Sequence, residues 1–262
     1  MYTSINSADI LNFMNSKKIK VLIPARYQST RFPGKPLALI LGKALVIRVA
    51  EICSRAIGNE NVYVVTDDLR IQNECDVNGY QSILSKKEAQ TGTDRIASVM
   101  NEIDADIFLN VQGDEPCISE KDILLAIEAK IKYPDHVING FCEFETQPSN
   151  ITTSIPKVVM NENNDLIYIS RANIPIIHKS HLKNSPSKYL RQVCIYAFNS
   201  SQLAAFYKFG RRSALEATED IEILRFFELG IQIKMMRMSQ SLAVDYPDDI
   251  AIVEQHIKAI SS

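Results

Sequence analysis

Residues 19–36 read IKVLIPARYQSTRFPGKP, a short apolar run followed at once by a polar, basic loop. The run at 19–24 predicts a buried strand. In a parallel sheet, ligands bind beyond the carboxyl ends of the strands, so the following loop is the first place to expect one. This loop carries three cations beside a glycine that lets backbone N–H groups approach a ligand: Arg26, Arg31, Lys35 and Gly34.

Two interpretations of this loop stay open on charge alone. The cations suit a polyphosphate, because guanidinium groups offer planar forks to phosphate oxygens. The alternative is a solvated surface loop whose cations cluster by chance. The string PARYQSTRFPGKP is neither a Walker pattern nor GxGxxG, so an ordinary P-loop and a dinucleotide fingerprint are both excluded.

Working outward, strand-like and helix-like runs alternate over the first half of the chain. The predicted strands lie at 61–66, 81–84 and 106–111, and the predicted helices at 37–56, 68–78, 93–103 and 121–133. This alternation predicts a parallel sheet covered on both faces.

After residue 134 strand-like and helix-like runs no longer alternate regularly. Strand candidates at 137–145, 155–160, 166–170 and 193–198 are separated by polar loops, the longest at 178–188, and a helix at 216–229, a strand at 231–238 and a helix at 248–260 follow. We therefore expect an α/β fold: a mixed, mainly parallel sheet flanked by helices, with a small inserted β-rich lobe. The expected organisation is an N-terminal arm at 1–17 and a single domain at 18–262, with the lobe at roughly 135–200.

Composition excludes several classes of protein. The formal net charge of −2 over 262 residues lacks the positive excess of a nucleic-acid binder. Five scattered cysteines without a CxxC pair argue against a disulfide framework or a zinc site and fit a reducing cytoplasm. We find no signal peptide and no run long enough to span a membrane, so we expect neither a membrane nor a nucleic acid as partner.

Two distant aspartates are candidate metal ligands. NVQGDEP at 110–116 continues a predicted strand and places Asp114 at its carboxyl end, and LAVDYPDDI at 242–250 places Asp245 after the last predicted strand. Mg²⁺ takes few carboxylate oxygens from a protein and shares the rest with phosphate and water. The alternatives are a turn aspartate and a helix-capping aspartate.

The string QTGTDRIASV at 90–99 offers two hydroxyls and a guanidinium near a predicted helix start, from Thr91, Thr93 and Arg95. An ordinary helix cap with an exposed arginine is the alternative. Taken in order, the basic loop, this string, QGDEP and the late VDYPDD resemble the CMP-Kdo synthetase (3-deoxy-manno-octulosonate cytidylyltransferase) family. The resemblance runs from about residue 18 to 260.

The resemblance implies a fold like that of the nucleotide-diphospho-sugar transferases and a defined reaction. CMP would pass from CTP to the anomeric hydroxyl of a 3-deoxy-octulosonate-type sugar acid, with pyrophosphate released, in lipopolysaccharide biosynthesis or, as the alternative, in capsule synthesis. It further implies a cytoplasmic homodimer and Mg²⁺ bound by Asp114 and Asp245. Arg26 and Lys35 would hold the β- and γ-phosphates with help from Arg31, and the nucleotide would lie against Thr91, Thr93, Arg95 and Gln112.

For the sugar acid, the resemblance suggests a cation, amides and carboxylates: Gln112, Arg171, Gln192, Tyr196, Glu219 and Glu222, with Arg191 nearby. Glu219 and Glu222 are three residues apart and would share one face of the predicted helix. A solvated helical face is the alternative for this pair, and core packing is the alternative for Tyr196.

Four departures from the family pattern fall on the expected sugar side. Gln192 stands where the family usually has His in a segment like RHLGIY, and Ala89 where a His is frequent. Ile223 replaces Gln in an LEQLR-like segment, and Tyr246 replaces Thr in a VDTPED-like one. One alternative is therefore the same chemistry on a modified sugar, such as 8-amino-3,8-dideoxy-manno-octulosonate. Another sugar nucleotidyltransferase and a non-catalytic nucleotide-binding subunit are further alternatives.

Overall fold

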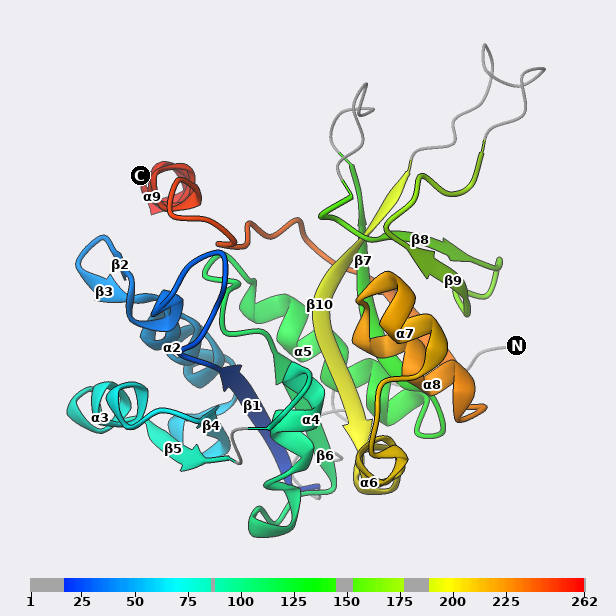
Figure 1. Ribbon diagram of the computed structural model, residues 1–262, viewed down its shortest axis with the longest axis horizontal. Coiled ribbons are helices and arrows are strands. Elements are labelled where there is room, and N and C mark those ends of the chain that lie inside the picture. Colours follow the sequence, from blue (N-terminus) through cyan, green and yellow to red (C-terminus); the bar gives the residue numbers. More distant parts are fainter. Residues whose placement is uncertain (1–16, 86–87, 145–152, 177–188, 262) are drawn as a thin grey trace.

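The structure is a computed structural model that describes residues 17–85, 88–144, 153–176 and 189–261 (Figure 1). Seven strands form the main path of the central sheet in the order β11-β7-β10-β6-β1-β4-β5. In chain order these are β1 (Ile19–Ala25), β4 (Val62–Thr66), β5 (Gln81–Leu84), β6 (Ile107–Val111), β7 (Val137–Glu143), β10 (Leu190–Asn199) and β11 (Ile233–Arg237).

The sheet is mainly parallel, with one reversed strand in its middle. β1 pairs in parallel with β4 and β6, β4 with β5, and β7 with β11. The reversed strand is β10, which runs antiparallel to both β6 and β7. The expectation of a mixed, mainly parallel sheet flanked by helices is therefore confirmed.

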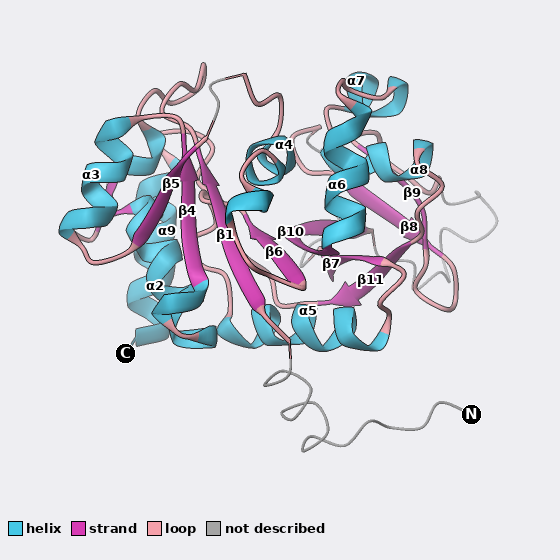
Figure 2. Cartoon of the chain, turned by 90° about the horizontal axis from the view of Figure 1, so that it is seen from below, coloured by secondary structure: helices cyan, strands magenta, loops and turns pink. Residues whose placement is uncertain are grey.

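Helices cover both faces of this sheet (Figure 2). On one face lie α2 (Leu45–Ile57) and α5 (Glu120–Lys132), and on the other α4 (Gly92–Ala97) and α6 (Ser200–Phe209). Alternate residues of β1 supply the two cores, since Val21 and Ile23 pack with α2 and α5 whereas Leu22 packs with α4 and α6. The remaining helices are α3 (Leu69–Val77), α7 (Ala214–Glu219), α8 (Arg225–Glu228) and α9 (Asp249–Ser261).

The expected lobe at 135–200 includes strands of the central sheet. β7 and β10 belong to that sheet, and among the described residues of this stretch the antiparallel pair of β8 (Lys157–Met160) and β9 (Leu166–Ser170) stands off its main path, attached through β8 to β10. The expected loop at 178–188 and residues 1–16 of the expected arm lie outside the described residues. The division into an arm and one domain stays a prediction.

Three predicted helices differ in extent from the structure. The helix expected over 93–103 ends as α4 at Ala97. The helix expected over 37–56 begins only at Leu45, because a 3₁₀ turn (Lys35–Leu37) and a short hairpin of β2 (Leu39–Ile40) and β3 (Lys43–Ala44) precede it. The helix expected over 216–229 is interrupted at Asp220, whose φ of 52° is left-handed and ends α7. A 3₁₀ turn (Glu222–Leu224) then leads into α8.

This interruption corrects the prediction that Glu219 and Glu222 share a helical face. Glu219 is the last residue of α7, whereas Glu222 begins the 3₁₀ turn beyond the break. The two carboxylates consequently contact different neighbours. Two further 3₁₀ turns lie at Asn59–Asn61 and Met100–Glu102. Within the described part of the chain, no helix has the length and apolar character needed to cross a bilayer.

Candidate active site

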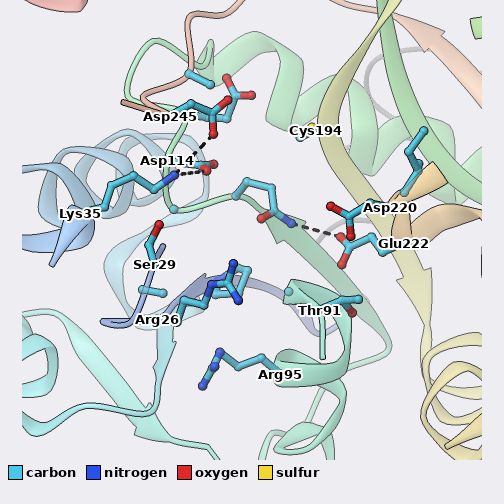
Figure 3. A pocket seen from close by; sticks show the side chains of 18 of the residues that line it. Arg26, Ser29, Lys35, Thr91, Arg95, Asp114, Cys194, Asp220, Glu222 and Asp245 are labelled. Atoms are coloured by element: carbon cyan, nitrogen blue, oxygen red, sulfur yellow. Dashed lines mark hydrogen bonds and ion pairs between the residues drawn. The ribbon is translucent and has the colours of Figure 1, made fainter. Parts of the chain in front are cut away.

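A cavity of about 420 Å³ lies beyond the carboxyl ends of β1 and β6 (Figure 3). Its walls come from the loops that follow these two strands, the start of α4, the middle of β10, the segment around Glu222, and residues 243–245. Strands at the switch between parallel and reversed pairing therefore surround it, which is where an open α/β sheet leaves room for a ligand.

Lys35 lies at the meeting point of the two predicted metal ligands. Its Nζ donates to Asp114 Oδ2 at 2.6 Å and to the carbonyl of Val244 at 2.8 Å, and lies 4.0 Å from Asp245 Oδ1. Arg31 approaches from the other side, with Nη2 3.0 Å from Asp245 Oδ1. The structure thus brings together the cations of the first loop and two carboxylates that are more than a hundred residues apart in sequence.

Gly34 is needed for this arrangement of the basic loop. Its φ of 71° is left-handed, and its N–H donates to the carbonyl of Tyr27 at 2.9 Å. A Cβ at this position would lie 3.2 Å from the Tyr27 hydroxyl oxygen. A larger residue would therefore be strained in backbone and in space, and Lys35 follows directly in the chain.

The pair of Asp114 and Asp245 fits a magnesium ion. Both side chains are carboxylates, the hard oxygen ligands that Mg²⁺ prefers, and both line the cavity. In the residues that the structure describes, no cluster of three or more His, Cys, Asp or Glu is placed to hold a metal. Two protein carboxylates are sufficient where substrate phosphates and water supply the other ligands.

Glu115 is a largely buried carboxylate that also lines the cavity and that the sequence analysis did not identify. It is 6% exposed and accepts a hydrogen bond from the Ser241 hydroxyl. Burial raises its pKa to about 7, and the charge of neighbouring Asp114 adds to the effect, while Ser241 and Arg191 oppose it. Nothing in the string QGDEP distinguishes a buried glutamate from an exposed one.

The residues predicted on the nucleotide side form the wall at the start of α4. Thr91 lines the cavity and caps the helix, its Oγ1 accepting from the N–H of Asp94 at 3.0 Å. Thr93 is buried, and its Oγ1 accepts from Asn110 Nδ2 at 3.1 Å. Thr91 therefore both caps α4 and lines the cavity, whereas Thr93 is buried in the protein interior.

Arg95 and Gln112 are also held in place. Arg95 is 3% exposed, and its guanidinium donates to Asp67 Oδ2 at 2.9 Å and to Ser85 Oγ at 2.6 Å, so the alternative of an exposed arginine is wrong. Gln112 Nε2 donates to Glu222 Oε1 at 3.2 Å. Both residues line the cavity.

On the predicted sugar side, Arg171, Gln192, Tyr196 and Glu222 line the cavity and Glu219 does not. Glu219 turns toward the lobe, accepting from Ser170 Oγ at 2.6 Å and from the N–H of Arg171 at 2.9 Å. The structure therefore gives no support to the predicted contact between Glu219 and the substrate, which stays a prediction. Glu219 supports Arg171, whose Nε donates to the carbonyl of Glu219 at 2.6 Å.

Buried hydrogen bonds fix the other sugar-side candidates. Gln192 is 5% exposed, and its Nε2 donates to Asn139 Oδ1 at 3.0 Å and to the Tyr196 hydroxyl at 3.3 Å. Glu222 accepts from the N–H of Thr93 at 2.9 Å, and burial raises its pKa. Arg191, suggested nearby, is not among the cavity-lining residues.

The four departures from the family pattern divide into two groups. Gln192 and Ala89 line the cavity, whereas Ile223 is 1% exposed and packs in the core on the α4 side of the sheet. Tyr246 lies beside Arg31, with the guanidinium carbon 5.5 Å from the ring centroid. Further cavity residues that the sequence analysis did not name are Ser29, which lies in the basic loop, and Cys194, Arg212 and Asp220, which tertiary structure brings there.

Comparison with known proteins agrees with this geometry. The family profile described as "Cytidylyltransferase" matches residues 20–234. A 3-deoxy-manno-octulosonate cytidylyltransferase of Protochlamydia amoebophila is 36% identical over 89% of this chain and 92% of its own length. A protein of the same name from Escherichia coli is 33% identical over 85% of this chain and 88% of its own length.

A solved structure described as CMP:2-keto-3-deoxy-manno-octonic acid synthetase complexed with CTP matches with a TM-score of 0.84 and 32% identity, over 92% of this chain and 99% of that one. A 4-diphosphocytidyl-2C-methyl-D-erythritol synthase of Anaerococcus prevotii, at 14% identity and a TM-score of 0.62 over 94% and 99%, shares the fold alone. The chain therefore belongs to the cytidylyltransferase family, among the 3-deoxy-manno-octulosonate cytidylyltransferases (CMP-Kdo synthetases).

Proposed function

We propose that this protein transfers CMP from CTP to the anomeric hydroxyl of a 3-deoxy-octulosonate-type sugar acid and releases pyrophosphate, as a step of lipopolysaccharide biosynthesis. The observation that carries the proposal is the convergence of Lys35, Asp114 and Asp245 at one end of the cavity. The proposal is also supported by similar proteins named 3-deoxy-manno-octulosonate cytidylyltransferase and by a similar structure described as complexed with CTP.

In the proposed reaction, the sugar hydroxyl oxygen forms a bond to the α-phosphorus of CTP while the bond from that phosphorus to the bridging oxygen of the β-phosphate breaks. Positioning and charge neutralisation do most of the work in such transfers. Lys35 and Arg26, assisted by Arg31, hold the β- and γ-phosphates. These residues line one end of the cavity.

The remaining residues orient the two substrates. Thr91, Arg95 and Gln112 form the nucleotide wall, with Thr93 supporting it from behind. Arg171 offers its charge to the sugar carboxylate, and Gln192, Tyr196 and Glu222 offer hydrogen-bonding groups to the sugar hydroxyls. Glu222 also accepts a hydrogen bond from Gln112, and this bond joins the nucleotide side of the cavity to the sugar side.

We propose Mg²⁺ as the cofactor, held by Asp114 and Asp245. When bound, the ion would neutralise phosphate charge and lower the pKa of a coordinated hydroxyl. Before it binds, Lys35 and Arg31 neutralise the two carboxylates. We also propose a homodimer in the cytoplasm, and the free thiols of Cys53, Cys75, Cys117 and Cys194 fit a reducing compartment.

The test is an assay of pyrophosphate release with each of the common ribonucleoside triphosphates and 3-deoxy-manno-octulosonate, with Mg²⁺ and with excess chelator. We expect activity with CTP and Mg²⁺ and none with chelator. Equal activity with another triphosphate would reject the cytidylyltransferase assignment. Light scattering after size-exclusion chromatography tests the dimer, and a monomer mass would reject it.

A modified sugar is the second candidate substrate. Gln192 and Ala89, which stand where the family has His, both line the cavity, so the differences lie where a sugar would meet them. Comparing turnover of 3-deoxy-manno-octulosonate with its 8-amino analogue decides between the two. A strong preference for the unmodified sugar would reject the second candidate.

A further inference from the structure

A buried guanidinium joins the nucleotide wall to the segment that carries Glu222. Arg225, the first residue of α8, is 0% exposed. Its Nη1 and Nη2 donate to the two carboxylate oxygens of Asp94 at 2.6 and 3.0 Å, and its Nε and Nη2 each donate to Glu216 at 2.7 Å. Its guanidinium carbon lies 3.7 Å from the ring centroid of Phe206.

Neither Asp94 nor Arg225 lines the cavity, but each is adjacent to groups that do. Asp94 Oδ2 accepts from the hydroxyl of Thr91 at 2.9 Å, and Thr91 is part of the cavity wall. Glu222 lies three residues before Arg225 and accepts from the N–H of Thr93. Thr93 and Asp94, which lie just after Thr91 in the chain, are therefore bound to Glu222 and Arg225 of the segment at 222–225.

The geometry points to Arg225 as a positioning residue that, through Asp94, holds the nucleotide wall at residues 91–93 against Glu222. The inference rests on the proposed function. A single side chain can do this because its fork satisfies two carboxylates from different elements at once, which a lysine cannot match. Both carboxylates are shielded from water, with 14% of the Asp94 side chain and 1% of the Glu216 side chain exposed, so the bonds have little competition.

The hydrogen bonds from Arg225 to Asp94 and Glu216, here called the bridge, affect the site through Glu222. Its carboxylate accepts from Thr93 on one side and from Gln112 Nε2 on the other, so it follows any movement of the wall. Weakening the bond between Arg225 and Asp94 leaves the wall attached to the segment at 222–225 only through Glu222. We expect the nucleotide to be bound less tightly as a result, although no contact to it has been removed.

The test is the dissociation constant for CTP, measured by calorimetry without the sugar, for Arg225→Lys and Asp94→Asn. Both variants are expected to bind CTP at least about tenfold more weakly than the parent, with a matching rise in KM for CTP and kcat within about threefold. The stability control is Leu203→Ala, which creates a cavity in the same core without touching the bridge. This control should lower the melting temperature and leave CTP binding unchanged.

Asp94→Asn keeps the bond between Arg225 and Glu216, so it tests the inference even where Arg225→Lys does not fold. CTP affinity within about twofold of the parent in Asp94→Asn would overturn the inference and leave the proposed function standing. Equal weakening by Leu203→Ala would also overturn it, because loss of stability alone would then explain the effect. A parent protein that does not bind CTP would reject the proposed function itself.

Discussion

Replacing Glu115 with Gln should stabilise the fold at alkaline pH and leave it nearly unchanged in acid. The pKa of this buried carboxyl is raised from 4.5 to about 7, chiefly by burial. Between these values the folded state binds more protons than the unfolded state, so stability falls as the pH rises through this window. The shift corresponds to about 3 kcal/mol at pH values above the folded pKa, since each unit is worth about 1.4 kcal/mol.

The assay is urea unfolding of parent and variant at about pH 5 and about pH 8.5, with chelator and without nucleotide. The amide oxygen of Gln can still accept from Ser241, so the variant keeps that bond while losing the charge. The variant should gain about 2.5 kcal/mol relative to the parent between the two pH values. Glu102→Gln, at an exposed site, is the control and should gain nothing. An equal parent–variant difference at both pH values would refute the argument from burial.

Three further predictions follow from single contacts. Asp114→Asn removes the charge that faces Lys35 and should lower kcat for pyrophosphate release at least about 100-fold, with an unchanged circular dichroism spectrum; near-normal turnover would reject its role. Glu222→Gln turns an amide donor toward either Thr93 or Gln112 and should lower kcat/KM for the sugar acid about tenfold; an unchanged value would remove Glu222 from the site. Asn164→Ala should cost about 1 kcal/mol in unfolding free energy because φ is 63°, whereas Asn164→Gly should cost less; the reverse order would contradict the backbone argument.

The parallel half of the fold could be predicted because its signals are local. The apolar runs that form β1, β4 and β6 are bounded by polar turns, and α3 ends before Asn78 and Gly79 as a helix stop predicts. The reversed direction of β10 could not be predicted, because an apolar run gives a strand but neither its direction nor its neighbours. α6 was overlooked although its signals are present, with Asn199 and Gln202 forming a capping box.

In the candidate site, residues at the ends of strands were easier to predict than residues placed by tertiary contacts. Asp114 follows β6 directly, so its place at the carboxyl edge was predictable. The inward turn of Arg95 was not, because it depends on Asp67, which lies in a different loop. The prediction that Glu219 and Glu222 share a helical face was wrong because of one residue. Asp220 adopts a left-handed backbone conformation, which is uncommon for a residue other than glycine, and nothing in the sequence ATEDIEIL at 217–224 predicts it.

The pairing of Lys35 and Arg31 with Asp114 and Asp245 makes one end of the cavity nearly self-compensated in charge. A bare anion such as sulfate must therefore compete with carboxylates already in contact with the cations. An anion bound to a divalent metal ion differs, because the metal can contact the carboxylates while the anion's oxygens contact the cations. Every charge then keeps a neighbour of opposite sign. With the proposed Mg²⁺ carried by the nucleotide, the ion pairs themselves would favour a nucleotide–metal complex over simple phosphates, without a separate element that rejects small anions.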